Sequence, residues 1–255
     1  MIPKIIHYCW LGNPYPDEIK RCIDSWHEYM PDYEFRLWNA ETFDINSVKW
    51  VREAFEAKKY AFATDYIRLY ALYNHGGIYL DTDILVYKSF NDLLSLPYFI
   101  GQDFLGAFDT GIIGAEKGTP WIKEVMDYYN DANFINNDGS LNIKNNPVVF
   151  FERLFPHYRF RQIKSTIEFK EDNNIFNLFP AKFFNGRNNI GPVKYPESYS
   201  SHLYAASWTS SPGIKFSKKS FYSCLRNVIY GINYHFLRKM LSTNSTQFFD
   251  RVIKE

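Results

Sequence analysis

The sequence predicts an α/β fold, in which a mostly parallel sheet is covered by helices on both faces. Apolar runs rich in β-branched residues alternate along the chain with segments whose apolar residues recur at helical spacing. Glycine and proline separate these segments. The 255 residues are enough for one large domain with a buried core. The chain is therefore long enough to be an enzyme.

The elements follow in order from these patterns. We expect strands at residues 2–8, 33–38, 78–87, 98–102 and 111–115, where apolar and β-branched residues dominate. Helical spacing predicts helices at 17–30, 47–57, 60–74, 119–129 and 147–155. A stretch rich in Asn, Asp and Gly at 133–146 predicts a surface loop. In such sheets ligands bind beyond the carboxyl ends of the strands.

Charge divides the chain into two parts, which we predict to be a catalytic domain at 1–214 and a helical tail at 215–255. The net charge is +1, but the tail holds eight Lys or Arg residues against Asp250 and Glu255, which leaves −5 for residues 1–214. That sign argues against nucleic acid as a partner of the main domain. In the tail, basic residues interleave with aromatic and aliphatic ones. This pattern fits a peripheral membrane helix or a helix packed on the domain.

Cysteine usage and hydropathy indicate the compartment. Cys9, Cys22 and Cys224 form no CxxC pair and leave one cysteine over, which argues against a disulfide framework and a zinc site. No uninterrupted apolar run reaches the roughly 18 residues of a membrane span. We therefore expect a cytoplasmic protein, with a possible association of the tail with the inner face of the membrane.

Two carboxylates in one apolar segment form the most informative motif. Asp81 and Asp83 lie within the strand expected at 78–87, where uncompensated acids would be costly. Side chains two apart on a strand share a face, so both carboxylates could reach one cation. Oxygen ligands suit Mn²⁺ or Mg²⁺, which complete their coordination with phosphate oxygens and water. The motif therefore predicts a metal-bound nucleotide diphosphate.

A second polar pair lies on the preceding helix. Asp65 and Arg68 are three residues apart and share a helix face, which also fits an ordinary intrahelical ion pair. Because this helix leads through Gly76 and Gly77 into the Asp81 segment, both side chains could instead reach the pocket. There Arg68 would neutralise a diphosphate and Asp65 would accept from sugar or ribose hydroxyls. Trp10, after the first strand, could stack on a base or pack in the core.

With these blocks in order, the sequence resembles the DXD-containing glycosyltransferases of family 32, which are related to the catalytic domain of the large clostridial glucosylating toxins. The resemblance implies a GT-A fold, a Rossmann-like mixed sheet flanked by helices that binds a nucleotide sugar. It also implies a UDP-sugar donor and transfer with retention of configuration. It covers the first 90 residues densely and rests on IPKIIHYCWLG (2–12), Ser25-Trp26 with Pro31-Asp32-Tyr33, ATDYIR (63–68) and GGIYLDTD (76–83).

The resemblance also implies roles for single residues. Asp83 would bind the metal directly, Asp81 would act on ribose or through the metal's water shell, and Asp65 and Arg68 would hold the donor. The late segment 201–208 resembles the family's closing block, which makes His202 a third metal ligand and lets Ser207 and Trp208 close over the donor. His202 could equally be structural.

The resemblance weakens in the middle of the chain. Asn146-Pro147 stands where relatives have Gly-Pro, and Asp109-Thr110-Gly111 replaces an Asn-containing turn. Recognition of the sugar and of the glycan or lipid-linked acceptor therefore stays open. The sequence predicts a hexosyltransferase such as those that build surface polysaccharides. Its alternatives are a metal-dependent phosphoesterase or nucleotidyltransferase, and a carbohydrate-binding protein without turnover.

Overall fold

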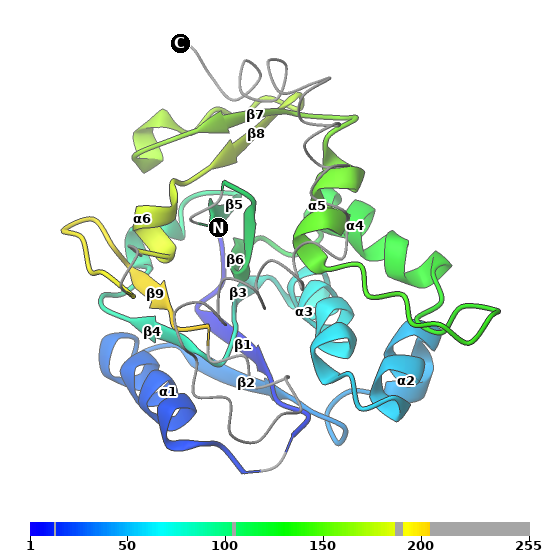
Figure 1. The fold of residues 1–255 in the computed structure, drawn as a ribbon. Coiled ribbons are helices and arrows are strands. Elements are labelled where there is room, and N and C mark those ends of the chain that lie inside the picture. The colour runs from blue at the N-terminus through cyan, green and yellow to red at the C-terminus, as the bar shows by residue number, and fades with distance from the viewer. Residues whose placement is uncertain (13, 104–105, 187–190, 205–255) are drawn as a thin grey trace.

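A five-stranded sheet forms the centre of the protein (Figure 1). The structure is a computed structural model that describes residues 1–12, 14–103, 106–186 and 191–204. The strand order is β2-β1-β3-β6-β5. The strands are β1 (Ile5–Cys9), β2 (Glu34–Trp38), β3 (Gly77–Leu80), β5 (Tyr98–Gln102) and β6 (Phe108–Ala115).

Helices cover both faces of this sheet. On one side lies α1 (Asp17–Tyr29), and on the other lies a layer of several helices (Figure 1). That layer consists of α2 (Lys49–Glu56), α3 (Tyr60–His75), α4 (Pro120–Asp131) and α5 (Asn146–Leu154). The predicted fold class, an α/β mixed sheet flanked by helices, is confirmed.

Small elements complete the described chain. Two further strand pairs form beside the main sheet, β4 with β9 antiparallel and β7 with β8 parallel. These elements are β4 (Ile84–Val86), β7 (Arg159–Gln162), β8 (Ile175–Leu178), β9 (Ser200–His202), α6 (Ala181–Phe184) and the 3₁₀ turns Ile45–Ser47, Asn91–Leu93 and Thr166–Glu168.

Strand alternation divides the core into two buried clusters, one on each face. On β3, Ile78 and Leu80 belong to the cluster under α1, whereas Tyr79 belongs to the cluster under α3. Because the α3 face is enclosed by the sheet and other helices, α3 buries polar as well as apolar residues, including Asp65 and Arg68. The Tyr79 face and α3 therefore meet at the polar site described below.

The turn from α3 into β3 requires its two glycines. Gly76 and Gly77 have positive φ angles of 67° and 109°. A Cβ on Gly77 would lie 2.6 Å from the carbonyl oxygen of Ile5, and one on Gly76 would lie 2.7 Å from the amide nitrogen of Lys117. The chain can therefore reverse directly from helix to central strand, which brings α3 against the carboxyl end of β3.

Two details differ from the sequence-based expectation. The sheet is mixed rather than mostly parallel, because β6 runs antiparallel to both β3 and β5. The strand expected at 78–87 is interrupted at residues 81–83 and forms β3 and β4, which belong to different sheets. The edge of β4 is held by α1, where Trp26 Nε1 donates to the Ile84 carbonyl (2.7 Å) and the Val86 amide donates to Ser25 Oγ (3.0 Å).

Some predictions fall outside the described residues. These include the tail at 215–255, Ser207 and Trp208, so the boundary between a catalytic domain and a tail stays a prediction. Cys9 and Cys22 are buried free thiols. Within the described chain, every helix is too short or too polar to traverse a bilayer.

Candidate active site

Asp81 and Asp83 lie in a turn at the carboxyl end of β3, not on a strand as predicted. The amide of Asp81 still donates to the Gly111 carbonyl of β6 (2.8 Å), and the amide of Ile84 donates to the Asp81 carbonyl (3.1 Å). The second bond closes a turn that carries the chain out of the sheet. The two aspartates thus lie just beyond the carboxyl end of the central strand, where open-sheet α/β proteins bind their ligands.

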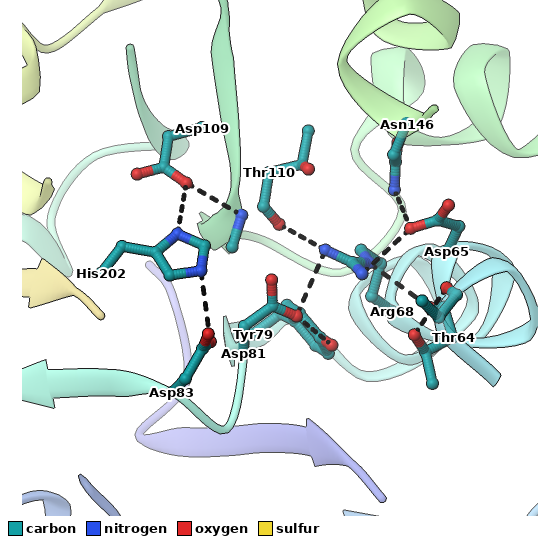
Figure 2. A network of polar contacts seen from close by, with 12 residues as sticks. Thr64, Asp65, Arg68, Tyr79, Asp81, Asp83, Asp109, Thr110, Asn146 and His202 are labelled. Carbon is teal, nitrogen blue, oxygen red and sulfur yellow. Dashed lines mark hydrogen bonds and ion pairs between the residues drawn. The ribbon is translucent and has the colours of Figure 1, made fainter. Parts of the chain in front are cut away.

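Arg68 occupies the centre of a buried polar network around this turn (Figure 2). It is only 5% exposed, and each of its guanidinium nitrogens has a protein acceptor. Nη2 lies 3.0 Å from Asp65 Oδ1, Nη1 donates to the Thr110 carbonyl (2.8 Å), and Nε points to the Thr64 carbonyl (3.4 Å). The guanidinium also lies 4.7 Å from the centre of the Tyr79 ring, a cation–π distance. Arg68 is therefore fixed by the fold.

Asp81 links two parts of the network because its two oxygens face different partners. Oδ1 accepts from the Tyr79 hydroxyl (2.8 Å) and lies 3.4 Å from Arg68 Nη1. Oδ2 faces the strand β6, 3.0 Å from the place where a Cβ on Gly111 would lie. The carboxylate is thus anchored through one oxygen, which leaves the other available to a ligand.

Asp65 is paired on the other side of Arg68 with a residue from a distant helix. Asn146, the first residue of α5 and 3% exposed, donates from Nδ2 to Asp65 Oδ1 (3.0 Å). Burial raises the pKa of Asp65 to about 6, although Arg68 and Asn146 act to lower it. Since a carboxylate only accepts, it fixes the amide orientation and leaves Asn146 Oδ1 buried without a hydrogen bond.

His202 is held between two carboxylates at the end of β9. Its Nε2 lies 3.2 Å from Asp83 Oδ1, and its Nδ1 lies 3.5 Å from Asp109 Oδ1. The first distance permits a hydrogen bond, whereas the second permits only an ion pair. Burial alone would lower the pKa of His202, but Asp83 and Asp109 raise it well above its ordinary value. Tyr204 stacks on the ring at 4.1 Å.

Gly111 gives these groups the room to converge. A Cβ at this position would lie 3.0 Å from Asp81 Oδ2, 3.0 Å from His202 Cε1 and 3.2 Å from Asp109 Oδ1. Its backbone φ is not in the left-handed region, so space rather than conformation requires glycine here. The sequence places this glycine directly after Asp109 and Thr110, but the pattern alone does not reveal its role.

One group of described ligand atoms fits a metal ion. Asp81, Asp83 and His202 each offer one atom, and these atoms lie within 4.8 Å of one another. Adjacent ligands of an octahedral ion with bonds of about 2.1 Å lie about 3 Å apart, which matches the 3.2 Å between His202 Nε2 and Asp83 Oδ1. Two carboxylate oxygens and one imidazole suit a divalent ion of the Mn²⁺ or Mg²⁺ type.

The net charge of the network also favours a bound cation. Four buried or half-buried carboxylates, those of Asp65, Asp81, Asp83 and Asp109, share one guanidinium and one imidazole. Even a protonated histidine leaves the group negative, because four carboxylates then face two cations. Buried acids with uncompensated charge are costly, so a bound cation would stabilise this arrangement.

Five of the residues predicted from sequence, Asp65, Arg68, Asp81, Asp83 and His202, are brought together in this network. Trp10 follows β1 and packs against Tyr15, with ring centres 5.0 Å apart. Its neighbour Cys9 is buried close enough to Arg68 and Asp81 for their charges to act on its thiol, and burial is the main cause that raises its pKa to about 12. Trp10 therefore directly follows a residue that lies close to the network.

Tyr79, Asp109 and Asn146 were not predicted as site residues. Strand alternation could have found Tyr79, since it shares a face with Asp81. Asp109 and Asn146 were noted only as departures from the family pattern. Their positions depend on tertiary packing of β6 and α5, which no local signal in the sequence encodes.

Comparison with known proteins finds a family that is similar to the part of the chain that carries this network. A family model described as a glycosyltransferase sugar-binding region containing a DXD motif matches residues 16–100, which include Asp65, Arg68, Asp81 and Asp83. This part of the chain is thus similar to the DXD-containing glycosyltransferases. The predicted resemblance to DXD-containing glycosyltransferases is confirmed over residues 16–100.

Individual relatives carry the same description. Inositol phosphoceramide mannosyltransferase 3 of Schizosaccharomyces pombe is 32% identical over 133 residues, which cover 49% of this chain and 36% of the relative. An uncharacterized glycosyltransferase of Acanthamoeba polyphaga mimivirus is 26% identical over 235 residues, 86% of this chain and 87% of the relative. The chain spans little more than a third of the length of the mannosyltransferase.

Among solved structures, a glycosyltransferase involved in glycosylation of the major capsid of PBCV-1 is also similar. It is 14% identical to this chain, and the two structures superpose with a TM-score of 0.46. The superposition covers 80% of this chain and 95% of that chain.

Proposed function

We propose that this GT-A-type domain is a metal-dependent glycosyltransferase that moves a hexose from a nucleotide diphosphate, with a UDP-sugar as donor, to a glycan or lipid-linked glycan. One observation carries the proposal. Ligand atoms of Asp81, Asp83 and His202 converge within 4.8 Å in a network that has more buried carboxylates than cations. A divalent ion and a diphosphate together would complete this arrangement.

The metal would be held by Asp83, His202 and the free Oδ2 of Asp81. When bound, Mn²⁺ or Mg²⁺ supplies positive charge to the diphosphate oxygens and stabilises them as a leaving group. Tyr79 and Arg68 hold Asp81 through its other oxygen, so the ligand atom is preorganised before any metal arrives. The ion identity is tested by comparing Mn²⁺, Mg²⁺ and Ca²⁺ in calorimetric titrations.

The sugar would lie on the other side of Asp81. Asp65 Oδ1 is occupied by Arg68 and Asn146, which leaves Oδ2 to accept from a sugar or ribose hydroxyl. Because protein acceptors engage each nitrogen of Arg68, its main contribution would be to orient Asp65 and Asp81 and to add positive charge near the diphosphate. Trp10 would stack on the base, and Ser207 with Trp208 would close over the donor.

Transfer would retain the anomeric configuration. In this reaction the bond between C1 and the phosphate oxygen breaks, the acceptor oxygen forms the new bond to C1 on the same face, and the acceptor proton passes to the departing diphosphate. No covalent glycosyl-enzyme is involved in this proposal. Nuclear magnetic resonance of the fresh product reports the anomer, and inversion would contradict the proposal.

A lipid-linked acceptor fits two observations. The named relative acts on inositol phosphoceramide, a lipid, and residues 215–255 of this chain are basic and rich in apolar side chains. We therefore propose peripheral contact with the inner face of the membrane from a cytoplasmic location. Deletion of residues 215–255 should abolish sedimentation with anionic liposomes and spare hydrolysis of the donor; unchanged sedimentation would contradict membrane contact by the tail.

A donor panel tests the proposed function. UDP-glucose, UDP-galactose, UDP-N-acetylglucosamine and GDP-mannose are incubated with the protein and Mn²⁺, with and without EDTA, and the released nucleotide is measured. We expect release from one donor above all others and only with metal. Phosphoesterase activity would instead release phosphate from the free nucleotide. A carbohydrate-binding protein would release nothing from any donor.

A further inference from the structure

Asp109 is a buried carboxylate whose position the proposed chemistry does not yet explain. It lies on β6, is 4% exposed, and approaches His202 on the ring edge away from Asp83 (Figure 2). Its Oδ1 accepts from the Gly111 amide (3.2 Å), while Oδ2 has no hydrogen-bond partner. A buried carboxylate with so few donors is costly, so its placement needs a compensating partner.

The one described group that can compensate Asp109 is His202. Nδ1 of the imidazole lies 3.5 Å from Asp109 Oδ1, and it too is buried without a hydrogen bond. The unpartnered Nδ1 therefore faces an acceptor, the Oδ1 that also binds the Gly111 amide, slightly beyond hydrogen-bond distance. A small rotation of the ring would pair them.

The other ring nitrogen faces the candidate metal ligands. Nε2 lies 3.2 Å from Asp83 Oδ1, on the side where Asp81 also contributes its ligand atom. Stacking on Tyr204 fixes the plane of the ring, at 4.1 Å and an angle of 8°. Stacking alone does not fix which nitrogen carries the proton, whereas a carboxylate at Nδ1 would.

We propose that Asp109 is a positioning residue for the metal site. Its carboxylate accepts a hydrogen bond from Nδ1–H of His202, which leaves the Nε2 lone pair directed at the ion. Histidine ligands commonly donate a hydrogen bond from their second ring nitrogen to such a carboxylate, which fixes the tautomer and strengthens the ligand. This inference rests on the proposed function, since it takes Asp81, Asp83 and His202 to be the metal ligands.

Gly111 supports this role because it ties Asp109 to the same cluster. Its amide holds Asp109 Oδ1, and the space above its Cα is the place where Asp81, His202 and Asp109 come together. Asp109 could instead bind the ion directly, since its Oδ1 also borders this space. The two possibilities differ in whether the effect of Asp109 depends on His202.

The test measures Mn²⁺ affinity without any donor, in parent protein, Asp109→Asn, His202→Gln and the double variant. Asparagine matches the shape of aspartate but cannot accept as strongly, so Asp109→Asn should weaken Mn²⁺ binding by about 10- to 100-fold. If Asp109 acts through His202, the double variant should bind no more weakly than His202→Gln. Additive losses would overturn the proposal and favour direct coordination.

A spectroscopic measurement on bound Mn²⁺ reports the histidine ligand directly and does not depend on catalytic activity. Electron spin echo of bound Mn²⁺ should show imidazole nitrogen coupling in the parent, and this coupling should be weakened in Asp109→Asn. Asp92→Asn is the matched control, because Asp92 accepts from Tyr199 (2.6 Å) away from the network and should leave Mn²⁺ affinity unchanged. Unchanged coupling and affinity in Asp109→Asn would refute the role, whereas a parent that binds no Mn²⁺ would refute the proposed function itself.

Discussion

Two halves of the buried network treat negative charge differently. In the arginine half, Asp65 and Asp81 share the guanidinium of Arg68, which is permanently charged and held by protein acceptors. In the histidine half, Asp83 and Asp109 flank His202, whose charge depends on a proton. In the first half, the fold supplies one permanent cation for two carboxylates. In the second half, two carboxylates face positive charge only when His202 is protonated or a cation is added.

This difference separates stability from function. Because its cation is fixed, the arginine half is part of the buried core. Removing the Arg68 guanidinium should therefore lower the stability of the fold in addition to any effect on activity. The histidine half carries surplus acid, which costs stability in exchange for an affinity toward divalent ions. Asp81 belongs to both halves, and its two oxygens divide between them.

The largest expected effect comes from breaking the arginine half. Arg68→Met should lower the free energy of unfolding by about 3–5 kcal/mol, because it leaves two buried carboxylates without their cation. Urea denaturation followed by circular dichroism measures the change. Arg153→Met is the matched control: its ion pair with Glu124 is half exposed and should contribute less than about 1 kcal/mol. A similar small loss for both variants would contradict the division into halves.

Urea denaturation of a variant in the histidine half should show no such loss of stability. Asp83→Asn removes one surplus charge, so the metal-free variant should be as stable as the parent or slightly more stable at pH 7. Added Mn²⁺ should raise the melting temperature of the parent but not of Asp83→Asn, since a ligand stabilises only the state that binds it. Loss of several kcal/mol in metal-free Asp83→Asn would mean that this half also supports the fold.

A smaller effect is expected where the halves meet the strand β6. Gly111→Ala places a methyl group 3.0 Å from both Asp81 Oδ2 and His202 Cε1, so the ligands must move apart. We expect Mn²⁺ affinity to fall roughly 10-fold, by analogy with other disturbances of groups that orient metal ligands. Gly101→Ala would instead press on Phe184 (2.8 Å) and serves as a control that changes stability but not metal affinity.

The arginine half also predicts a pH dependence of sugar binding. The pKa of Asp65 is about 6, so its carboxylate is ionised above this pH and protonated below it. The extra affinity of a UDP-sugar over UDP should therefore be constant above about pH 7 and decline as the pH falls through 6. Asn146→Ala removes a hydrogen bond that lowers this pKa and should move the midpoint to higher pH.

Isothermal titration at several pH values measures this shift, which we expect to be the smallest of these effects. Asn177→Ala is the control, because Asn177 is a buried amide bonded to Lys170 and lies outside the network. A midpoint that is the same in Asn146→Ala and in the parent would exclude Asn146 as a partner that tunes Asp65.

The α/β fold and five of the site residues can be predicted from the sequence, because the motifs that carry them are local. Asp65 and Arg68 share a helix turn, and Gly76 with Gly77 leads that helix directly to Asp81. The features that the sequence does not predict depend on tertiary packing. The apolar residues before Asp81 and after Asp83 suggest one continuous strand, but the turn closed by the bond from the Ile84 amide to the Asp81 carbonyl ends β3.

Long-range packing also explains why Asp109 and Asn146 could not be assigned. Each is an ordinary polar residue in its local sequence and reaches the site only because β6 pairs with β3 and α5 packs against the α3 layer. Their common trait is a buried polar atom without a partner, which becomes visible only in three dimensions.

The central claim is that Asp81, Asp83 and His202 join a divalent ion to a nucleotide diphosphate. Its most direct test is the Mn²⁺-dependent affinity for UDP, measured by calorimetry in the parent and in Asp83→Ala. The parent should bind UDP tightly only with Mn²⁺, and Asp83→Ala should lose at least about 100-fold of this affinity. Equal UDP affinity with Mn²⁺ or EDTA, or in both proteins, would contradict it.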